Sequence, residues 1–201
     1  MIEDRDFFVI EPIADSYLND IFNDGNPLYV EIGSGKGEFI SKYPTYHPNW
    51  NFIGLEMSEK RIRNCLKKLS IQQNPNVRMV RKFVDAGIRD LFRSQSVSGV
   101  FIQHPDPWPK RKHHRRRLIQ QDFLDALAEI LTPEATVQVS TDHSEYAAWI
   151  AEEFLKSPHF TSVQESPIQF EPNLDEHVST WFELEQKRNG FDPHFMLYKR
   201  I

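Results

Sequence analysis

The stretch Leu28–Phe39 reads LYVEIGSGKGEF, and it sets the fold expected of this chain. It begins with a short apolar run, which is typical of a strand buried in a parallel sheet. Three glycines follow, Gly33, Gly35 and Gly37, and a helical pattern then begins over Phe39–Tyr43. Glycine lets the backbone turn tightly and lets a ligand approach without a Cβ in the way. The stretch therefore predicts a strand, a ligand-binding turn and a helix.

The same alternation of strand and helix continues along the chain. Further strands are expected at Asn51–Leu55, Val77–Val80, Val97–Ile102, Thr136–Val139, Phe160–Gln164 and Phe195–Tyr198. Helices are expected from the N-cap Ser58 to about Gln72, at Ile88–Phe92, at about Arg115–Leu131, from the cap Ser140–Asp142 to about Leu155, and at Thr180–Arg188. This order predicts an α/β fold with a mostly parallel sheet and helices on both faces. We expect a single domain over residues 28–201, preceded by an N-terminal arm over residues 1–27.

The composition excludes several classes of protein. Hydrophobic residues make up 39% and charged residues 26% of the 201 positions, as in an ordinary globular domain. A single cysteine, Cys65, excludes an intrachain disulfide framework and suits a cytoplasmic location. No apolar run approaches the length of a membrane span, so no membrane partner is expected. We also expect no metal site.

The glycine turn carries acidic rather than basic neighbours. Its spacing is G-x-G-x-G, so it departs from the G-x-G-x-x-G pattern of dinucleotide sites, and Glu31 and Glu38 flank it. Such a turn is poorly suited to a pyrophosphate, but it is compatible with S-adenosylmethionine, which carries a sulfonium and an ammonium. Glu56 ends the second strand nineteen residues after Gly37, where an acid can accept both ribose hydroxyls. Asp85 follows the third strand and is placed either to contact the adenine amino group or to cap a helix.

A proline-rich loop follows the fourth strand. Gln103–Lys110 reads QHPDPWPK, and its three prolines fix φ angles and remove backbone donors. Such a loop holds Asp106 and Trp108 rigidly at the mouth of a site, although a rigid turn with a packed tryptophan would have the same sequence. The basic segment Lys110–Arg117, KRKHHRRR, follows with six positive charges in a chain of net charge −5.

The basic segment predicts a local anion site on an otherwise acidic protein. We expect its arginines, among them Arg115 and Arg117, to contact RNA phosphates. The alternative is a solvated, charged helix start.

Four motifs together resemble the bacterial tRNA (guanine-N7-)-methyltransferase family: EIGSGKG, DPWPK with its basic tail, STD followed by Tyr146, and T-x-F-E at the end of the chain. The resemblance implies a Rossmann-like class I methyltransferase fold with a seven-stranded sheet and an antiparallel C-terminal strand. It implies transfer of a methyl group from S-adenosyl-L-methionine to N7 of the variable-loop guanosine of tRNA, with S-adenosyl-L-homocysteine as product.

Matching positions imply roles for individual residues. The cofactor-binding residues are Glu31, Gly33, Gly35, Gly37, Glu56, Asp85 and Asp106, and Asp106 is also the catalytic residue. The substrate-binding residues are Lys110, Arg116, Asp142, Thr180, Trp181, Phe182 and Glu183. Two positions depart from the family pattern. Trp181 stands where a basic or polar residue is usual, and His104 where an aromatic residue is usual.

Several alternatives stay open at the level of the sequence. A non-catalytic RNA-binding subunit would keep the fold, and an RNA amino-methyltransferase would act on guanine N2 or adenine N6. Asp106, Asp142 and Glu183 can each accept hydrogen bonds from a guanine edge, so their roles are not divided. The oligomeric state is left open between a monomer and a homodimer.

Overall fold

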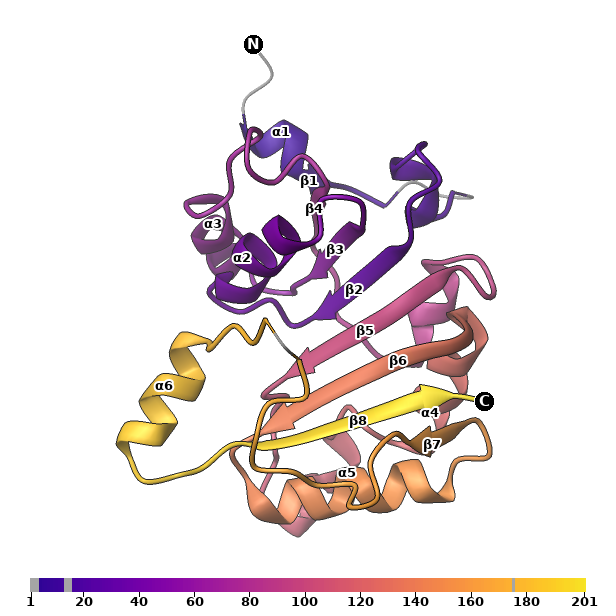
Figure 1. Cartoon of the computed structure of the whole chain (residues 1–201), viewed down its shortest axis with the longest axis vertical. Helices are drawn as coiled ribbons and strands as arrows, with labels where there is room; N and C mark the ends of the chain where they lie inside the picture. The colour runs from indigo at the N-terminus through magenta and orange to yellow at the C-terminus, as the bar shows by residue number, and fades with distance from the viewer. Residues whose placement is uncertain (1–3, 13–15, 175) are drawn as a thin grey trace.

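The computed structural model describes residues 4–12, 16–174 and 176–201, so residues 1–3 and 13–15 of the expected arm lie outside the described residues. One eight-stranded sheet runs through the molecule in the order β1-β4-β3-β2-β5-β6-β8-β7 (Figure 1). Its strands are β1 Val9–Ile10, β2 Leu28–Ile32, β3 Asn51–Leu55, β4 Val77–Val80, β5 Val97–Gln103, β6 Leu131–Thr141, β7 Phe160–Ser162 and β8 His194–Arg200. Neighbouring strands pair in parallel from β1 to β6, and β8 is antiparallel to both β6 and β7.

Helices cover both faces of this sheet. The α-helices are α1 Asp4–Phe8, α2 Glu38–Tyr46, α3 Glu59–Leu66, α4 Gln121–Ile130, α5 Ser144–Lys156 and α6 Trp181–Arg188. The short 3₁₀ helices are η1 Leu18–Ile21, η2 Ala86–Asp90 and η3 Arg111–Arg116. Over the part of the chain that is described, no helix combines the length and the apolar character needed to cross a membrane.

Alternate residues along the strands pack into two separate hydrophobic clusters. In β3, Phe52 packs into the cluster under α1, α2 and α3, whereas Ile53 packs into the cluster under η2, α4 and α5. In β5, Phe101 and Val100 divide in the same way. Successive side chains of a strand point to opposite faces, so both faces of the sheet are apolar. This double burial is what the short apolar runs of the sequence predict.

The predicted fold class is confirmed, with one additional strand. β2, β3 and β4 have the predicted bounds, and the C-terminal strand is antiparallel as the resemblance implied. The eighth strand is β1, which lies in the expected N-terminal arm and pairs with the edge strand β4. Two residues are too few to show a strand periodicity. The fully buried side chain of Phe8 fixes this segment to the cluster beneath α1 to α3.

Two helix boundaries differ from the prediction by several residues. The helix expected from Arg115 begins instead at Gln121, because η3 has no buried residue to hold a continuous helix against the sheet. The helix from Ser58 ends at Leu66 rather than Gln72, and the chain turns there through hydrogen bonds between Ser70 and Asn74. Ser58 does cap this helix, accepting the backbone N–H of Arg61.

The cap of α5 is also different. Ser140 and Thr141 belong to β6, and the ring of His143 accepts the N–H of Tyr146 at 3.3 Å. A histidine ring is not among the usual N-cap side chains. The sequence pattern therefore favours a cap among the residues before His143.

Gly37 offers a test of the packing between α2 and α3. Its φ is +84°, and a Cβ there would lie 2.7 Å from the Cα of Cys65 in α3. Gly25 has a similar φ of +73° with open space around it, so it is a matched control. We expect Gly37→Ala to lower the free energy of unfolding by about 3 kcal/mol and Gly25→Ala by about 1 kcal/mol, as measured by urea denaturation. Equal losses in both variants would contradict the close approach of the two elements.

Candidate functional site

The carboxyl ends of β2, β5 and β6 meet at one edge of the sheet, and α6 folds back beside them (Figure 1). The glycine turn follows β2, the proline-rich loop follows β5, and Asp142 follows β6. Two adjoining cavities of about 600 and 270 Å³ open at this edge. Residues that line both cavities are Gly33, Arg61, Gln103, His104, Pro105 and Asp106. The predicted cofactor and substrate residues are thus largely brought together.

The larger cavity contains Glu56. This carboxylate is 3% exposed, and it accepts the N–H of Gly35 at 3.0 Å and the N–H of Ser58 at 2.8 Å. Arg61 lies 3.7 Å from the same oxygen that Gly35 contacts. Glu56 therefore holds the glycine turn in place, and each of its oxygens keeps a second lone pair for a ligand.

Asp85 lines the same cavity and also caps η2. Its side chain accepts the N–H of Gly87 at 2.8 Å. The two interpretations given to this residue are therefore compatible, because only one carboxylate oxygen is used by the cap. The exposed side chains of Met57 and Phe83 complete an apolar wall beside it.

Glu31 lies in the smaller cavity as a buried, unpaired acid. Its side chain is 2% exposed, and Oε2 has no hydrogen-bond partner among the described residues. Burial, together with the negative charges of Glu38 and Glu56, raises the pKa of Glu31 to about 8. A buried carboxylate without a partner is energetically costly, so this position favours a cationic ligand.

The proline-rich loop carries unusual backbone conformations. His104 has a φ of +49° and Trp108 a φ of +42°, and each directly precedes a proline. Residues before proline favour extended conformations, so two left-handed residues in these positions are strained. Asp106 lies between them and lines both cavities. The sequence predicted a stiff loop, and these conformations give it a defined shape.

One prediction about the basic segment is wrong. Arg117 is 2% exposed, and its guanidinium donates to Glu145 at 3.1 and 2.6 Å and to the carbonyl of Pro107 at 2.9 Å. Its Cζ also lies 4.9 Å from the ring centroids of Tyr146 and Trp149. Arg117 therefore fastens the proline-rich loop to α5 and is not available to a phosphate.

The lysines and the other arginines of the basic segment are exposed. Arg115 and Arg116 line the larger cavity, and the Cζ of Arg116 lies 5.0 Å from the ring centroid of Trp108. Lys110 is exposed but lines neither cavity.

The T-x-F-E motif forms the start of α6. Thr180 caps the helix by accepting the N–H of Glu183 at 3.1 Å. Trp181 packs against the glycine turn, because the Nζ of Lys36 lies 3.0 Å from its ring centroid. Phe182 lies 5.1 Å from His104, measured between ring centroids. Thr180, Trp181 and Phe182 all line the smaller cavity.

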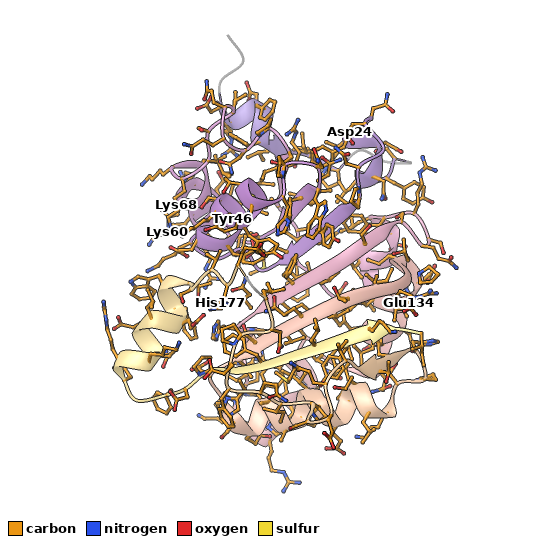
Figure 2. The ribbon with its side chains drawn as sticks, in the orientation of Figure 1. Asp24, Tyr46, Lys60, Lys68, Glu134 and His177 are labelled. Atoms are coloured by element: carbon orange, nitrogen blue, oxygen red, sulfur yellow. The ribbon has the colours of Figure 1, made fainter. Side chains whose placement is uncertain are left out.

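Glu183 does not line either cavity. It is 1% exposed and contacts His177 at 3.0 Å, Lys187 at 3.3 Å and Ser179 at 3.3 Å. Figure 2 shows His177 between α6 and the strand ends. Although burial acts to raise the pKa of Glu183, His177 and Lys187 lower it below its usual range. Its charge is therefore used within the protein.

Asp142 is half-buried beside His104, with 3.5 Å between Oδ1 and Nδ1. Burial acts to raise the pKa of Asp142, but His104, the backbone and His143 lower it, and the net shift is downward. His104, Lys36 and Arg61 were missed as site residues by sequence reasoning. His104 could have been found from its place between a buried strand and the first proline of the loop.

Comparisons with known proteins identify the family of this chain. A family model described as "Putative methyltransferase" matches residues 25–194. The tRNA (guanine-N(7)-)-methyltransferase of Thermotoga maritima is 33% identical over 91% of this chain and 57% of that protein. The enzyme of the same name from Ruegeria pomeroyi is 33% identical over 92% of this chain and 76% of that protein. The protein from Lacticaseibacillus casei is 40% identical over 61% of this chain and 56% of its own length.

The chain thus spans little more than half the length of two of these relatives. Among solved structures, TrmN from Thermus thermophilus has a TM-score of 0.61 at 16% identity, covering 89% of this chain and 46% of that one. An rRNA methylase from Streptococcus thermophilus has a TM-score of 0.57 at 11% identity, covering 92% of both chains. These likenesses show the methyltransferase fold, and the sequence relatives show the family. The chain belongs to the tRNA (guanine-N(7)-)-methyltransferase family.

Proposed function

We propose that this chain transfers a methyl group from S-adenosylmethionine to N7 of the variable-loop guanosine of tRNA. One observation carries this proposal: Asp106 lines both adjoining cavities, so a cofactor with its adenosine in the larger cavity and its ammonium at Glu31 in the smaller one would meet a base in the smaller cavity at the Asp106 carboxylate. The names of the relatives support the choice of base and of RNA. A tRNA substrate also suits a cytoplasmic location.

The acids of the site fit S-adenosylmethionine. The unpaired, buried oxygen of Glu31 would accept hydrogen bonds from the ammonium group. Glu56 would accept the ribose hydroxyls with its remaining lone pairs, while Asp85 would reach the adenine amino group with the oxygen that is not used by the η2 cap. The bound cofactor supplies a methyl group on a positively charged sulfur. A pyrophosphate would be repelled by the same three carboxylates.

Guanine N7 has an in-plane lone pair and carries no proton, so it needs no general base to become a nucleophile. As the N7–carbon bond forms and the sulfur–carbon bond breaks, positive charge moves onto the guanine ring. The task of the protein is then to align the base and to stabilise that charge. Asp106 is positioned for this role, because it stands where the two cavities join and its loop is rigid.

The exposed arginines and lysines of the basic segment would bind the phosphates of the tRNA. Lys110 would act at the rim, and Arg116 would contact RNA while its guanidinium stacks on Trp108. Thr180, Trp181 and Phe182 form one wall of the smaller cavity, so they would enclose the target base from the side of α6.

The decisive experiment is mass spectrometry of bulk tRNA after incubation with the protein and S-adenosylmethionine. We expect 7-methylguanosine to appear, and we expect Asp106→Asn to slow single-turnover methyl transfer by about 100-fold, because the variant keeps the shape of the side chain and removes its charge.

With both S-adenosylmethionine and tRNA saturating, so that the pH dependence of cofactor binding does not enter, the wild-type rate should also be nearly flat from about pH 6 to 9, since no proton leaves N7. A steep log-linear rise with pH, or methylation at an exocyclic amine, would favour an amino-methyltransferase. Cofactor binding without any transfer to tRNA would favour a non-catalytic subunit.

The raised pKa of Glu31 predicts a pH-dependent affinity for S-adenosylhomocysteine, which keeps the ammonium. The free protein holds a proton on Glu31 below about pH 8, and that proton must leave for the carboxylate to bind an ammonium. We expect calorimetry to show affinity rising from pH 6 to 8, by up to about tenfold per unit. Glu31→Gln should bind more weakly and without this rise. A flat wild-type profile would contradict the role of Glu31.

The same group predicts how the stability of the free protein changes with pH. The pKa of Glu31 rises from 4.5 to about 8 on folding, so the folded state binds more protons across that window. The contribution of Glu31 to the free energy of unfolding therefore falls as pH rises from 4.5 to 8. This fall should be absent from Glu31→Gln.

The basic segment predicts two different phenotypes. Arg115→Ala and Arg116→Ala should each lower the salt dependence of tRNA binding by about one unit per lost phosphate contact, without changing stability. Arg117→Ala should instead lower the free energy of unfolding by about 2 kcal/mol, because its bonds to Glu145 and Pro107 are lost. Filter binding at several salt concentrations and thermal unfolding separate the two. An unchanged salt slope in Arg115→Ala/Arg116→Ala would favour a solvated segment.

A further inference from the structure

His104 presents an unused polar atom to both cavities. Its side chain is 5% exposed, yet neither ring nitrogen has a hydrogen-bond partner of good geometry among the described residues. The backbone N–H of His104 donates to the carbonyl of Ser140 at 2.8 Å, and the ring lies against Phe182. The position of the ring is thus fixed from two sides. Buried polar atoms are normally paired, so an unpaired Nε2 on the wall of a site points to a ligand.

Asp142 determines which hydrogen-bonding role Nε2 has. With Nδ1 3.5 Å from the Asp142 carboxylate, the proton of a neutral ring is favoured on Nδ1, which leaves Nε2 as an acceptor. A doubly protonated ring would be a cation beside a base that becomes positive on N7-methylation, and it would oppose the proposed reaction. The proposed reaction therefore requires the neutral ring.

Guanine presents two donors on one edge, N1–H and the N2 amino group, so its recognition needs two acceptors. Asp142 is one of them. Glu183 is not available as the second, because its carboxylate is held by His177, Lys187 and Ser179 away from both cavities. His104 Nε2 is a second acceptor on the cavity wall.

The order of the strands places these acceptors correctly. β5 pairs with β2 on one side and with β6 on the other, so the glycine turn and Asp142 stand about 10 Å apart with His104 between them. In guanine, the N2 amino group lies farthest from N7, and N1–H lies beside it. A base with N7 toward the cofactor turn would bring N2 to Asp142 and N1–H to the nearer His104.

We propose that His104 is a specificity-determining residue whose Nε2 accepts the N1–H of the target guanine, while Asp142 accepts the N2 amino group. This assignment rests on the proposed function. It would also disfavour adenine, whose N1 is itself an acceptor and would face Nε2 without a proton between them.

The test measures the equilibrium affinity of the wild-type protein and its variants for three tRNA transcripts at saturating S-adenosylhomocysteine. The transcripts differ only in the target nucleoside. The target nucleoside is guanosine, inosine or 2-aminopurine riboside: inosine keeps N1–H and lacks the amino group, whereas 2-aminopurine keeps the amino group and lacks N1–H. The variants are His104→Phe, which keeps the ring contact with Phe182, and His104→Asn, which tolerates the left-handed backbone. His159→Phe is the control, because His159 is half-exposed beside Asp125 and lines neither cavity.

We expect both His104 variants to weaken binding of the guanosine and inosine transcripts by roughly tenfold and to leave the 2-aminopurine transcript almost unchanged. An equal loss on all three transcripts would overturn the assignment and leave only a packing role for the ring. A loss confined to guanosine and 2-aminopurine would overturn it in favour of the amino group. Wild-type binding that does not distinguish the transcripts would also overturn it.

Methyl transfer is measured separately on the guanosine transcript. If the His104 variants show the expected pattern of binding but the wild-type protein transfers no methyl group, the proposed function fails while the assignment of His104 stands. If the wild-type protein transfers the methyl group but the His104 variants lose binding equally on all three transcripts, the assignment of His104 fails while the proposed function stands.

Discussion

Parallel pairing of β2, β5 and β6 is the constraint on which the rest of the molecule depends. Parallel neighbours cannot be joined by a tight hairpin, so each strand returns across a face of the sheet through helices. The carboxyl edge is thereby left to short segments, and three of them, the glycine turn, the proline-rich loop and Asp142, come together there. Residues far apart in the sequence become neighbours because their strands are neighbours. The two adjoining cavities follow from this arrangement.

A second consequence of the sheet is that two acids of the site, Glu31 and Glu56, are buried. Glu31 ends near the base of the smaller cavity and Glu56 holds the glycine turn, and both are less than 5% exposed. Burial and these negative charges also raise the pKa of the Cys65 thiol to about 12. Cys65 is therefore an unreactive packing residue, and the negative potential is left for a cationic ligand.

The parts of the structure that could be predicted are those in which local pattern and tertiary packing agree. β2, β3 and β4 are short and mostly apolar. The geometry of the glycine turn and of the proline-rich loop is determined by their own glycines and prolines. The basic segment was different. In the sequence Arg117 resembles its basic neighbours, but in the fold it is the arginine that donates to Glu145 and Pro107. Glu145 lies 28 residues away, so no local sequence pattern indicates this partner. The role of Glu183 at the substrate stays a prediction, but its contacts with His177 and Lys187 could not be read from the sequence, because they form only once α6 has formed.

The two left-handed residues that flank Asp106 have a consequence for the RNA. A loop with this backbone, fastened to α5 through Arg117, has little freedom to follow an arriving nucleotide. In the proposed reaction the adjustment must then come from the other partner. The variable-loop guanosine would have to leave its stacked place in the tRNA, at a cost of a few kcal/mol. In tRNA transcripts whose tertiary core is already destabilised at this position, unstacking of the guanosine would cost less. In the proposed reaction, the rigidity of a single protein loop would thus make the folding energy of the tRNA itself part of the selection of substrate.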